Sequence, residues 1–402
     1  MKSRLAPAPA AAPRRLRVCV VGSGPRFLSG ISYYTNRLAG ALAQRHDVSV
    51  ILMRQLLPTR LYPGRERVGK QLVDLRYPPG TRVFDGVDWF WGPSIVRAVA
   101  LLVRQRPDVV VLQWWTGTVL HTYLALALVA RLLGARVVME YHEVLDTGEL
   151  AVPLAAAYVR AFKPLLVRLT DGAVVHSEFD RRDLIEHYAI GRKPLVLAPH
   201  GPYDQHVVDD GAPPPVAAAD RDGVCRLLYF GVIRPFKGVE DLVEAFGRLA
   251  PDQAAGFTLT VVGETWEGWE VPAEAIAASP YRDRITFVNH YVADDEVGSF
   301  FAAADAVVLP YHRSSASGPL HIAMAHGLPV VVSQVGGLVE ATREYEGAVP
   351  VAPADPAALA GALLEVAALK DRRFADPHSW ERTLDRYDEL FPAVLGTPVG
   401  SA

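Results

Sequence analysis

Residues 313–340, RSSASGPLHIAMAHGLPVVVSQVGGLVE, carry the clearest structural signals of this chain. They predict a loop, a short helix, a turn, a buried strand and a glycine loop in succession. Ser317 can accept a hydrogen bond as the N-cap of the helix, and Pro319 is tolerated in its first turn. Gly327 suits a left-handed C-terminal cap, after which a proline stops the helix and the apolar run 330–332 enters a strand.

The N-terminus of this predicted helix is directed at the loop 314–318. A helix of about three turns leaves unpaired N–H groups and a partial positive charge at that end. It is therefore an anion site, for which a diphosphate is a natural ligand. We expect the contacts to come from Ser314, Ser317, Gly318, Pro319 and Leu320.

Short apolar runs that end in glycine or polar residues recur along the chain, with helical stretches between them. Such runs are typical of parallel strands that are buried on both faces. One series lies in the first half and a second begins at residue 226, so the sequence predicts an α/β protein with two doubly wound parallel sheets. The runs are 16–21, 47–52, 108–112, 135–140 and 172–177, then 226–231, 257–263, 285–288, 304–310 and 330–332.

A Pro-, Ala- and Asp-rich stretch, 206–222, interrupts the two series and is the predicted linker. It separates an N-terminal domain, 16–205, from a C-terminal domain, 223–378. The Ala/Pro-rich residues 1–15 predict a disordered tail, and 379–402 predict a last helix followed by a tail.

Composition excludes several classes of protein. The 402 residues are 50% hydrophobic and 21% charged, which is globular, and the net charge of -3 gives no electrostatic reason to expect nucleic acid. Cys19 and Cys225 begin apolar strands and predict buried thiols in a reducing, cytoplasmic compartment. No run of 18 or more apolar residues predicts a membrane span.

Basic residues follow the first strand of the second series. Arg234 and Lys237 stand in a strand-to-helix loop, 231–238, where ligands of open α/β sheets bind. Arginine can bind a diphosphate through its planar fork and lysine can neutralise it as a point charge. A solvated basic loop is the alternative interpretation.

The most polar strand end of the first half is 140–149, EYHEVLDTGE. His142 follows an apolar strand there and is either a residue of the cleft or a structural histidine. Glu143 and Asp146 could contact the hydroxyls of an acceptor or could face solvent. Trp115 follows the strand before, and its aromatic face suits a sugar, a lipid tail or the core.

The segments 317–331 and 335–341 together resemble the donor-binding signature of family 4 (GT4-type) retaining glycosyltransferases. The loop 231–238 is similar to the basic loop of that family, with Lys237 matching directly and Arg234 standing two residues beyond the usual arginine.

The sequence departs from the family at two positions that usually hold glutamates for the donor sugar and ribose, here Ser314 and Ile322. It is similar to a subset of the family that has a serine–glycine loop. Glu340 is a candidate replacement for the ribose glutamate, or an ordinary acid at a helix start.

The resemblance implies a GT-B fold, in which two Rossmann-like domains face a cleft and the last helix crosses back to the first domain. It also implies that Gly263 and Tyr291 contact the nucleotide, that Ser29 and Gly30 cover the donor from the other domain, and that His142 lines the sugar site. Tyr291 could equally be a structural strand end.

The resemblance also implies an activity: retaining transfer of a sugar from a nucleotide-diphosphate sugar to a hydroxyl of a small-molecule, glycan or lipid-linked acceptor. No metal or cofactor is expected, because cations and helix amides would stabilise the leaving diphosphate. Asp220-Arg-Asp222 spells a metal-binding DxD motif but falls in the linker and predicts a surface turn. The Arg- and Leu-rich segment 158–168 could lie on the inner face of a membrane or pack between the domains.

Three other classes stay open at this point. One is a nonhydrolysing sugar-nucleotide epimerase of the same fold, which would need more acids and histidines in the cleft. Another is an NAD-dependent Rossmann enzyme, although Gly22-Ser-Gly24 lacks the third glycine of that fingerprint. The third is a catalytically silent nucleotide-sugar binding protein, suggested by the two missing glutamates.

Overall fold

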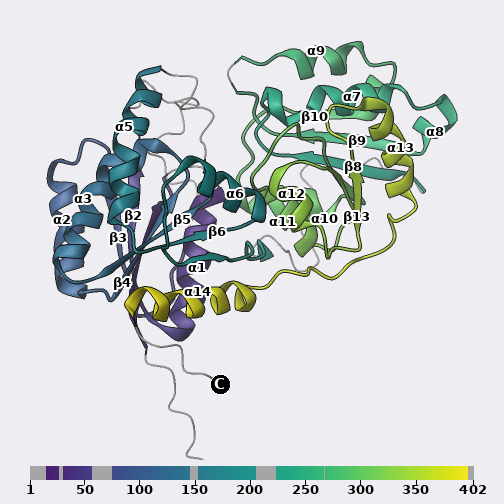
Figure 1. Cartoon of the computed structure of the whole chain (residues 1–402). Helices are drawn as coiled ribbons and strands as arrows, with labels where there is room; N and C mark the ends of the chain where they lie inside the picture. The colour runs from purple at the N-terminus through teal and green to yellow at the C-terminus, as the bar shows by residue number, and fades with distance from the viewer. Residues whose placement is uncertain are drawn as a thin grey trace, which may run out of the picture.

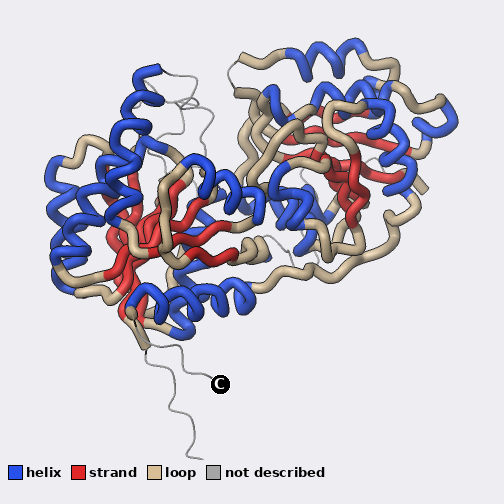
Figure 2. The backbone as a smooth tube through the Cα atoms, viewed as in Figure 1, coloured by secondary structure: helices blue, strands red, loops and turns tan. Residues whose placement is uncertain are grey.

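The structure, a computed structural model, describes residues 15–26, 30–56, 75–144, 153–204, 223–266 and 268–396. Two separate sheets, each made only of parallel strands and covered by helices, organise the molecule (Figures 1 and 2). This confirms the predicted α/β fold with two doubly wound sheets. The predicted linker, 206–222, lies outside the described residues.

The first sheet has seven strands in the order β3-β2-β1-β4-β5-β6-β7. Its strands are β1 Arg17–Ser23, β2 Asp47–Gln55, β3 Arg82–Asp88, β4 Val109–Trp114, β5 Arg136–Tyr141, β6 Gly172–Val175 and β7 Leu195–Leu197. Its helices are α1 Gly30–Arg45, α2 Gly92–Gln105, α3 Leu120–Leu132, α5 Pro153–Leu169 and α6 Glu178–His187, with a 3₁₀ turn at Gly117–Val119. Strands β3 and β7 were not predicted, because β3 mixes charged with apolar residues and β7 has three residues.

The second sheet has six strands in the order β10-β9-β8-β11-β12-β13. They are β8 Cys225–Phe230, β9 Phe257–Val262, β10 Ile285–Val288, β11 Ala306–Leu309, β12 Val330–Ser333 and β13 Ala348–Val351. The helices are α7 Val239–Gly247, α8 Pro251–Ala255, α9 Val271–Ala278, α10 Asp294–Ala302, α11 Gly318–Ala325, α12 Gly336–Ala341 and α13 Pro356–Ala367, with 3₁₀ turns at Pro235–Lys237 and Arg282–Arg284. The edge strand β13 was also not predicted.

The last helix, α14 Trp380–Leu395, packs on the first sheet beside α1 and β7 (Figure 1). Its buried face, which includes Leu384, Tyr387 and Phe391, shares a core with strands β1 and β2. The opposite face of the first sheet is covered by α2, α3 and α5. The alternative in which 158–168 packs between the domains is therefore not favoured, because α5 lies against α3.

Both cysteines are buried and free of disulfides, as predicted. None of the described helices is long and apolar enough to cross a bilayer.

Candidate active site

The carboxyl ends of the two sheets meet at a pocket of about 390 Å³, which is within the range of small-molecule sites. The first half of the chain contributes His176, Ser177 and His200 to its wall, and the second half contributes Ser317, His321 and Glu340. Of the predicted donor residues, the pocket therefore brings together Ser317 and Glu340. Arg234 and Lys237 do not line it.

The short helix of the opening stretch begins as predicted. Ser317 is extended at φ −140° and its Oγ accepts a hydrogen bond from the amide of Leu320, at 3.3 Å. Pro319 lies in the first turn, and the left-handed Gly327, φ +67°, follows the helix. The helix, α11, has eight residues and is therefore shorter than the predicted three turns. It ends at Ala325, and His326 is its C-cap.

The basic loop after β8 packs against the start of this helix. His312 donates a backbone hydrogen bond of 2.9 Å to the carbonyl of Phe236, which ties the loop to the segment before α11. The ammonium of Lys237 lies 3.6 Å from the ring centre of Tyr311, a cation–π contact. The Tyr311 hydroxyl accepts a 3.4 Å hydrogen bond from Ser317 Oγ, so Lys237 and the helix cap are linked through one aromatic ring.

Two further cations accompany Lys237. The guanidinium of Arg234 stacks over Trp266 at 4.4 Å, and that of Arg313 stacks over Phe236 at 4.5 Å. Both positive charges act on Lys237, so three cations share this end of the second sheet. Arg313 was not predicted, although it is the first residue of the segment 313–340.

Burial lowers the pKa of Lys237 to about 7. The carboxylate of Glu143, from the other half of the chain, opposes this shift by raising the pKa, and the two arginines add to it. A lysine poised in this way gains charge readily when an anion approaches, since an opposite charge favours the ammonium form. Glu143 thus faces the cationic end, and its predicted contact with an acceptor stays a prediction.

The glycine at the end of β9 allows two strand ends to approach. Gly263 has φ +151°, and a side chain on it would collide with the carbonyl of Gly231. The loop 231–238 can therefore run beside the turn after β9, where Ile233 and Thr265 form a bridge. Contacts of Gly263 and Tyr291 with a nucleotide stay predictions.

The glycine pair at the start of α12 allows the serine loop to lie against that helix. Side chains on Gly336 and Gly337 would collide with the carbonyls of Ser314 and Ser315. The amide of Gly337 donates a 3.2 Å hydrogen bond to the Ser314 carbonyl. The position of Ser314 is thus set by backbone contacts.

Glu340 joins the two halves of the molecule. Its carboxylate accepts hydrogen bonds from the backbone amides of Glu178, at 2.7 Å, and Phe179, at 2.9 Å. These amides open helix α6, whose positive end is thereby capped from the other half of the chain. Glu340 is the last residue but one of α12, so it is not the acid at a helix start that the sequence offered as an alternative. A role with ribose stays a prediction.

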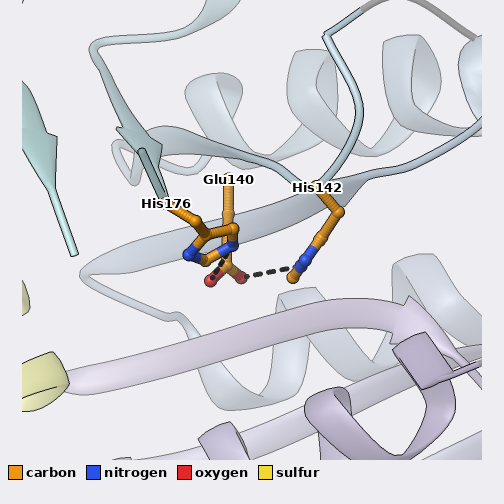
Figure 3. A group of neighbouring side chains, drawn as sticks. All are labelled: Glu140, His142 and His176. Atoms are coloured by element: carbon orange, nitrogen blue, oxygen red, sulfur yellow. Dashed lines mark ion pairs between the residues drawn. The ribbon is translucent and has the colours of Figure 1, made fainter. Parts of the chain in front are cut away.

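Glu140, His142 and His176 meet at the carboxyl ends of β5 and β6 (Figure 3). Glu140 is fully buried, and its carboxylate accepts hydrogen bonds from Tyr34 Oη at 2.7 Å and Gln113 Nε2 at 3.0 Å. The sequence singled out His142 in this group but not its two neighbours.

A chain of imidazole rings continues from this cluster to the second half of the molecule. His200 stacks on His321 of α11 with ring centres 4.7 Å apart, and His200 lies 5.2 Å from His176. Burial lowers the pKa of His200 and of His321 well below the ordinary value, and neighbouring histidines act in the same direction. The rings are therefore neutral near pH 7, which permits them to stack across the interface.

The remaining predicted residues are placed as follows. Trp115 is 9% exposed within the core under α3, so the structure favours core packing over an exposed platform for an acceptor. Gly30 begins α1, and its carbonyl accepts a 3.1 Å hydrogen bond from the Tyr203 hydroxyl. Ser29 and Asp146 lie outside the described residues.

Two parallel α/β sheets that meet at a pocket lined by both halves are the architecture of the GT-B fold. Residues 28–202 match the family described as Glycosyltransferase Family 4, and residues 225–368 match Glycosyl transferases group 1. The chain belongs to this glycosyltransferase family.

Curated relatives agree with this assignment. A glycogen synthase of Mycobacterium tuberculosis is 30% identical over 363 residues, which is 85% of this chain and 83% of that protein. A D-inositol 3-phosphate glycosyltransferase of Geodermatophilus obscurus is 34% identical over 247 residues, 57% of this chain and 54% of that protein. The match to the inositol-phosphate enzyme thus spans about half of its length.

Solved structures show the same fold. A glycosyltransferase from Rickettsia africae superposes with a TM-score of 0.66 at 15% identity, covering 96% of this chain and 100% of that one. A sucrose-phosphate synthase from Thermosynechococcus elongatus gives 0.63 at 19% identity, covering 95% and 96%. The Anabaena protein HepE in complex with UDP-glucose gives 0.61 at 16% identity, covering 94% and 99%.

Proposed function

We propose that this glycosyltransferase moves a sugar from a nucleotide-diphosphate sugar to an acceptor hydroxyl with retention of configuration and without a metal at the diphosphate. The observation that carries the proposal is the cluster of Arg234, Lys237 and Arg313 beside the Ser317-capped start of α11. Solved relatives of the fold that bind UDP or UDP-glucose support the donor class.

In this reaction the bond between the anomeric carbon and the phosphate oxygen breaks, and its electron pair goes to the diphosphate. Cations and helix amides that meet this growing charge lower the barrier more than they stabilise the bound donor. The acceptor oxygen forms the new bond on the face that the phosphate leaves. Its proton passes to the departing phosphate, so the chain needs no nucleophile of its own.

Calorimetry with UDP-, GDP-, ADP- and TDP-sugars tests the donor class. We expect one of these to bind and its affinity to persist in EDTA, because arginine and lysine supply the positive charge. NMR of the product should show the anomeric configuration of the donor. Failure of the whole panel to bind, or a product of inverted configuration, would contradict the proposal.

We further propose that the enzyme lies in the cytoplasm and touches an anionic membrane through the face formed by α2, α3 and α5, here called the arginine face. Two unpaired, buried cysteines support a reducing compartment. The three helices contain no aspartate or glutamate, in a chain of net charge -3. Their exposed residues include Arg97, Arg104, Arg160, Arg168, Val96, Val103, Leu128, Leu132, Leu154, Phe162 and Leu165.

Basic and apolar side chains on one face are the combination that binds anionic lipid surfaces. Sedimentation with phosphatidylglycerol-containing vesicles should capture the protein, and binding should fall with salt because the attraction is screened. The double variant Arg160→Glu, Arg168→Glu should weaken capture at least about tenfold, at roughly 1 kcal/mol for each arginine. Arg248→Glu changes an exposed arginine at the C-terminal cap of α7 in the other half and is the control. Equal capture by neutral phosphatidylcholine vesicles would exclude this surface as an anionic-lipid site.

A further inference from the structure

The Glu140, His142 and His176 cluster is arranged like the protein ligands of a metal ion (Figure 3). Nε2 of His142 lies 3.7 Å from Glu140 Oε2, and Nε2 of His176 lies 3.7 Å from Glu140 Oε1. Both distances exceed those of a hydrogen bond. They are only a few tenths of an ångström longer than the about 3.3 Å that separates ligand atoms around a tetrahedral zinc ion.

Strand register brings the three side chains together. In the β5–β6 pair, Glu140 is opposite Val174 and Tyr141 is opposite Val175. His142 and His176 are the next residues on the two strands, and their ring centres are 4.7 Å apart. The ligands thus follow neighbouring strands of a rigid sheet, which is where precise sites are held best.

Two of the three ligand atoms have no hydrogen-bond partner among the described residues. They are Nε2 of His142 and Nε2 of His176. His142 is 4% exposed and His176 is 9% exposed. A buried polar atom without a partner costs about 1–3 kcal/mol. Both nitrogens lie near the same carboxylate (Figure 3), so one ion between them would satisfy both.

The tautomer of His176 exposes a lone pair to the cluster. Its Nδ1 lies 2.9 Å from the carbonyl oxygen of Ala198, which can only accept, so Nδ1 carries the proton. In a neutral ring with its proton on Nδ1, Nε2 has a free lone pair. A carbonyl bonded to the far nitrogen is the usual way in which proteins orient a metal-binding histidine.

Two donors orient the carboxylate of Glu140. Tyr34 and Gln113 each donate to one of its oxygens. A fully buried anion therefore faces two histidine nitrogens, and a buried charge requires a positive partner.

We propose that Glu140, His142 and His176 bind one divalent transition-metal ion, with zinc as the best match. Two imidazole nitrogens and one carboxylate oxygen form a ligand set that zinc prefers, and three protein ligands leave a fourth position for water or a substrate oxygen. The ion would fix the ring of His142, which we expect to line the sugar site. The site belongs to the first sheet, whereas the cations of the proposed diphosphate site belong to the second, so the inference goes beyond the proposed function.

Metal titration of the full chain without nucleotide tests the site. After dialysis against a chelator, the protein should take up one Zn²⁺ per chain by elemental analysis, with a rise in thermal midpoint. Co²⁺ should bind in its place and give visible absorption bands of a four- or five-coordinate ion. Wild-type protein that retains neither ion at stoichiometric concentration would overturn the proposal, whether or not it binds nucleotide-sugars.

Variants locate the ion. His176→Gln and Glu140→Gln should each lower Zn²⁺ affinity by at least about tenfold, with circular dichroism confirming the fold. His187→Gln is the matched control, because His187 belongs to an exposed group with Asp183 and Glu186 that has comparable spacing. If His187→Gln removes the ion and His176→Gln retains it, the buried site is refuted. His176→Gln is the decisive variant if Glu140→Gln fails to fold.

Discussion

The two walls of the candidate site differ in how they are built. The wall from the second sheet, here called the cationic wall, consists of loop backbone and the capped start of α11. Arg234, Lys237 and Arg313 stand beside this start and do not line the pocket itself. The wall from the first sheet, here called the histidine wall, consists of the carboxylate of Glu140 and the buried rings of His142, His176 and His200, on which His321 of α11 stacks. The residues of the cationic wall belong to short contiguous sequence motifs. Those of the histidine wall come together only when strand ends that are distant in the sequence meet.

Because of this difference, the two walls tolerate different changes of residue and charge. The proposed recognition of phosphate by amides and point charges does not depend on the two glutamates that are absent at Ser314 and Ile322. The buried histidine wall depends on neutral rings and satisfied partners, and one unpaired charge there is costly. The following predictions probe this contrast, beginning with the largest expected effect.

Charge reversal at Lys237 should remove most of the affinity for a nucleoside diphosphate. Lys237→Glu replaces a cation of the proposed site by an anion, and we expect a loss of about 100-fold or more, measured by calorimetry with the diphosphate that the wild type binds. Lys370→Glu is the control, since Lys370 bonds the carbonyl of Gly223 away from the site. Unchanged affinity in Lys237→Glu would remove this residue from the cationic wall.

Acid should destabilise the histidine wall before the cationic wall. The pKa values of His200 and His321 are lowered in the folded state. Below about pH 6.5 these two histidines therefore bind protons in the unfolded chain but not in the folded chain. Stability therefore falls as pH decreases through that range. Asp180, whose pKa burial raises to about 7, works in the opposite direction and makes a matched variant necessary.

The measurement is the thermal midpoint between pH 7.5 and 5 for the wild type and for His200→Asn, His321→Asn. The double variant should lose fewer degrees over this interval, by several °C. Parallel curves for the two proteins would show that these rings do not set the acid sensitivity.

Removing the cap that joins the halves should have a smaller effect. Glu340→Ala leaves the amides of Glu178 and Phe179 at the start of α6 without their acceptor. We expect a loss of about 1–2 kcal/mol of stability, measured by urea unfolding. Glu344→Ala breaks only an exposed ion pair with Arg382 and should cost less than about 1 kcal/mol. Equal losses in the two variants would deny Glu340 this bridging role.

The smallest effect is expected at the N-cap of α11. Ser317→Ala should destabilise the protein by about 1 kcal/mol and weaken diphosphate binding less than Lys237→Glu does. Ser317→Asp should restore the cap but repel the anion. Ser379→Ala removes the equivalent cap of α14, so it should reproduce the loss of stability without any loss of binding.

The sequence alone predicts the α/β class, because continuous apolar runs between helices have few alternatives to buried parallel strands. It also determined the capped helix α11 and the basic loop, since caps, prolines and glycines act within a few residues of one another. It missed β3, β7 and β13, which are edge strands that are short or have mixed patterns. It also missed Arg313, which no local rule distinguishes from a solvated arginine.

The contacts of Glu340, His176, His200 and His321 are visible only in the tertiary structure. Glu340 caps a helix about 160 residues earlier in the chain, at separations of 162 and 161 residues. The stacked pair His200 and His321 likewise joins residues of different sheets. Such contacts depend on which strand ends face one another, and no periodicity or cap within a segment records that. The main features of the cationic wall could therefore be predicted from the sequence, whereas those of the histidine wall could not.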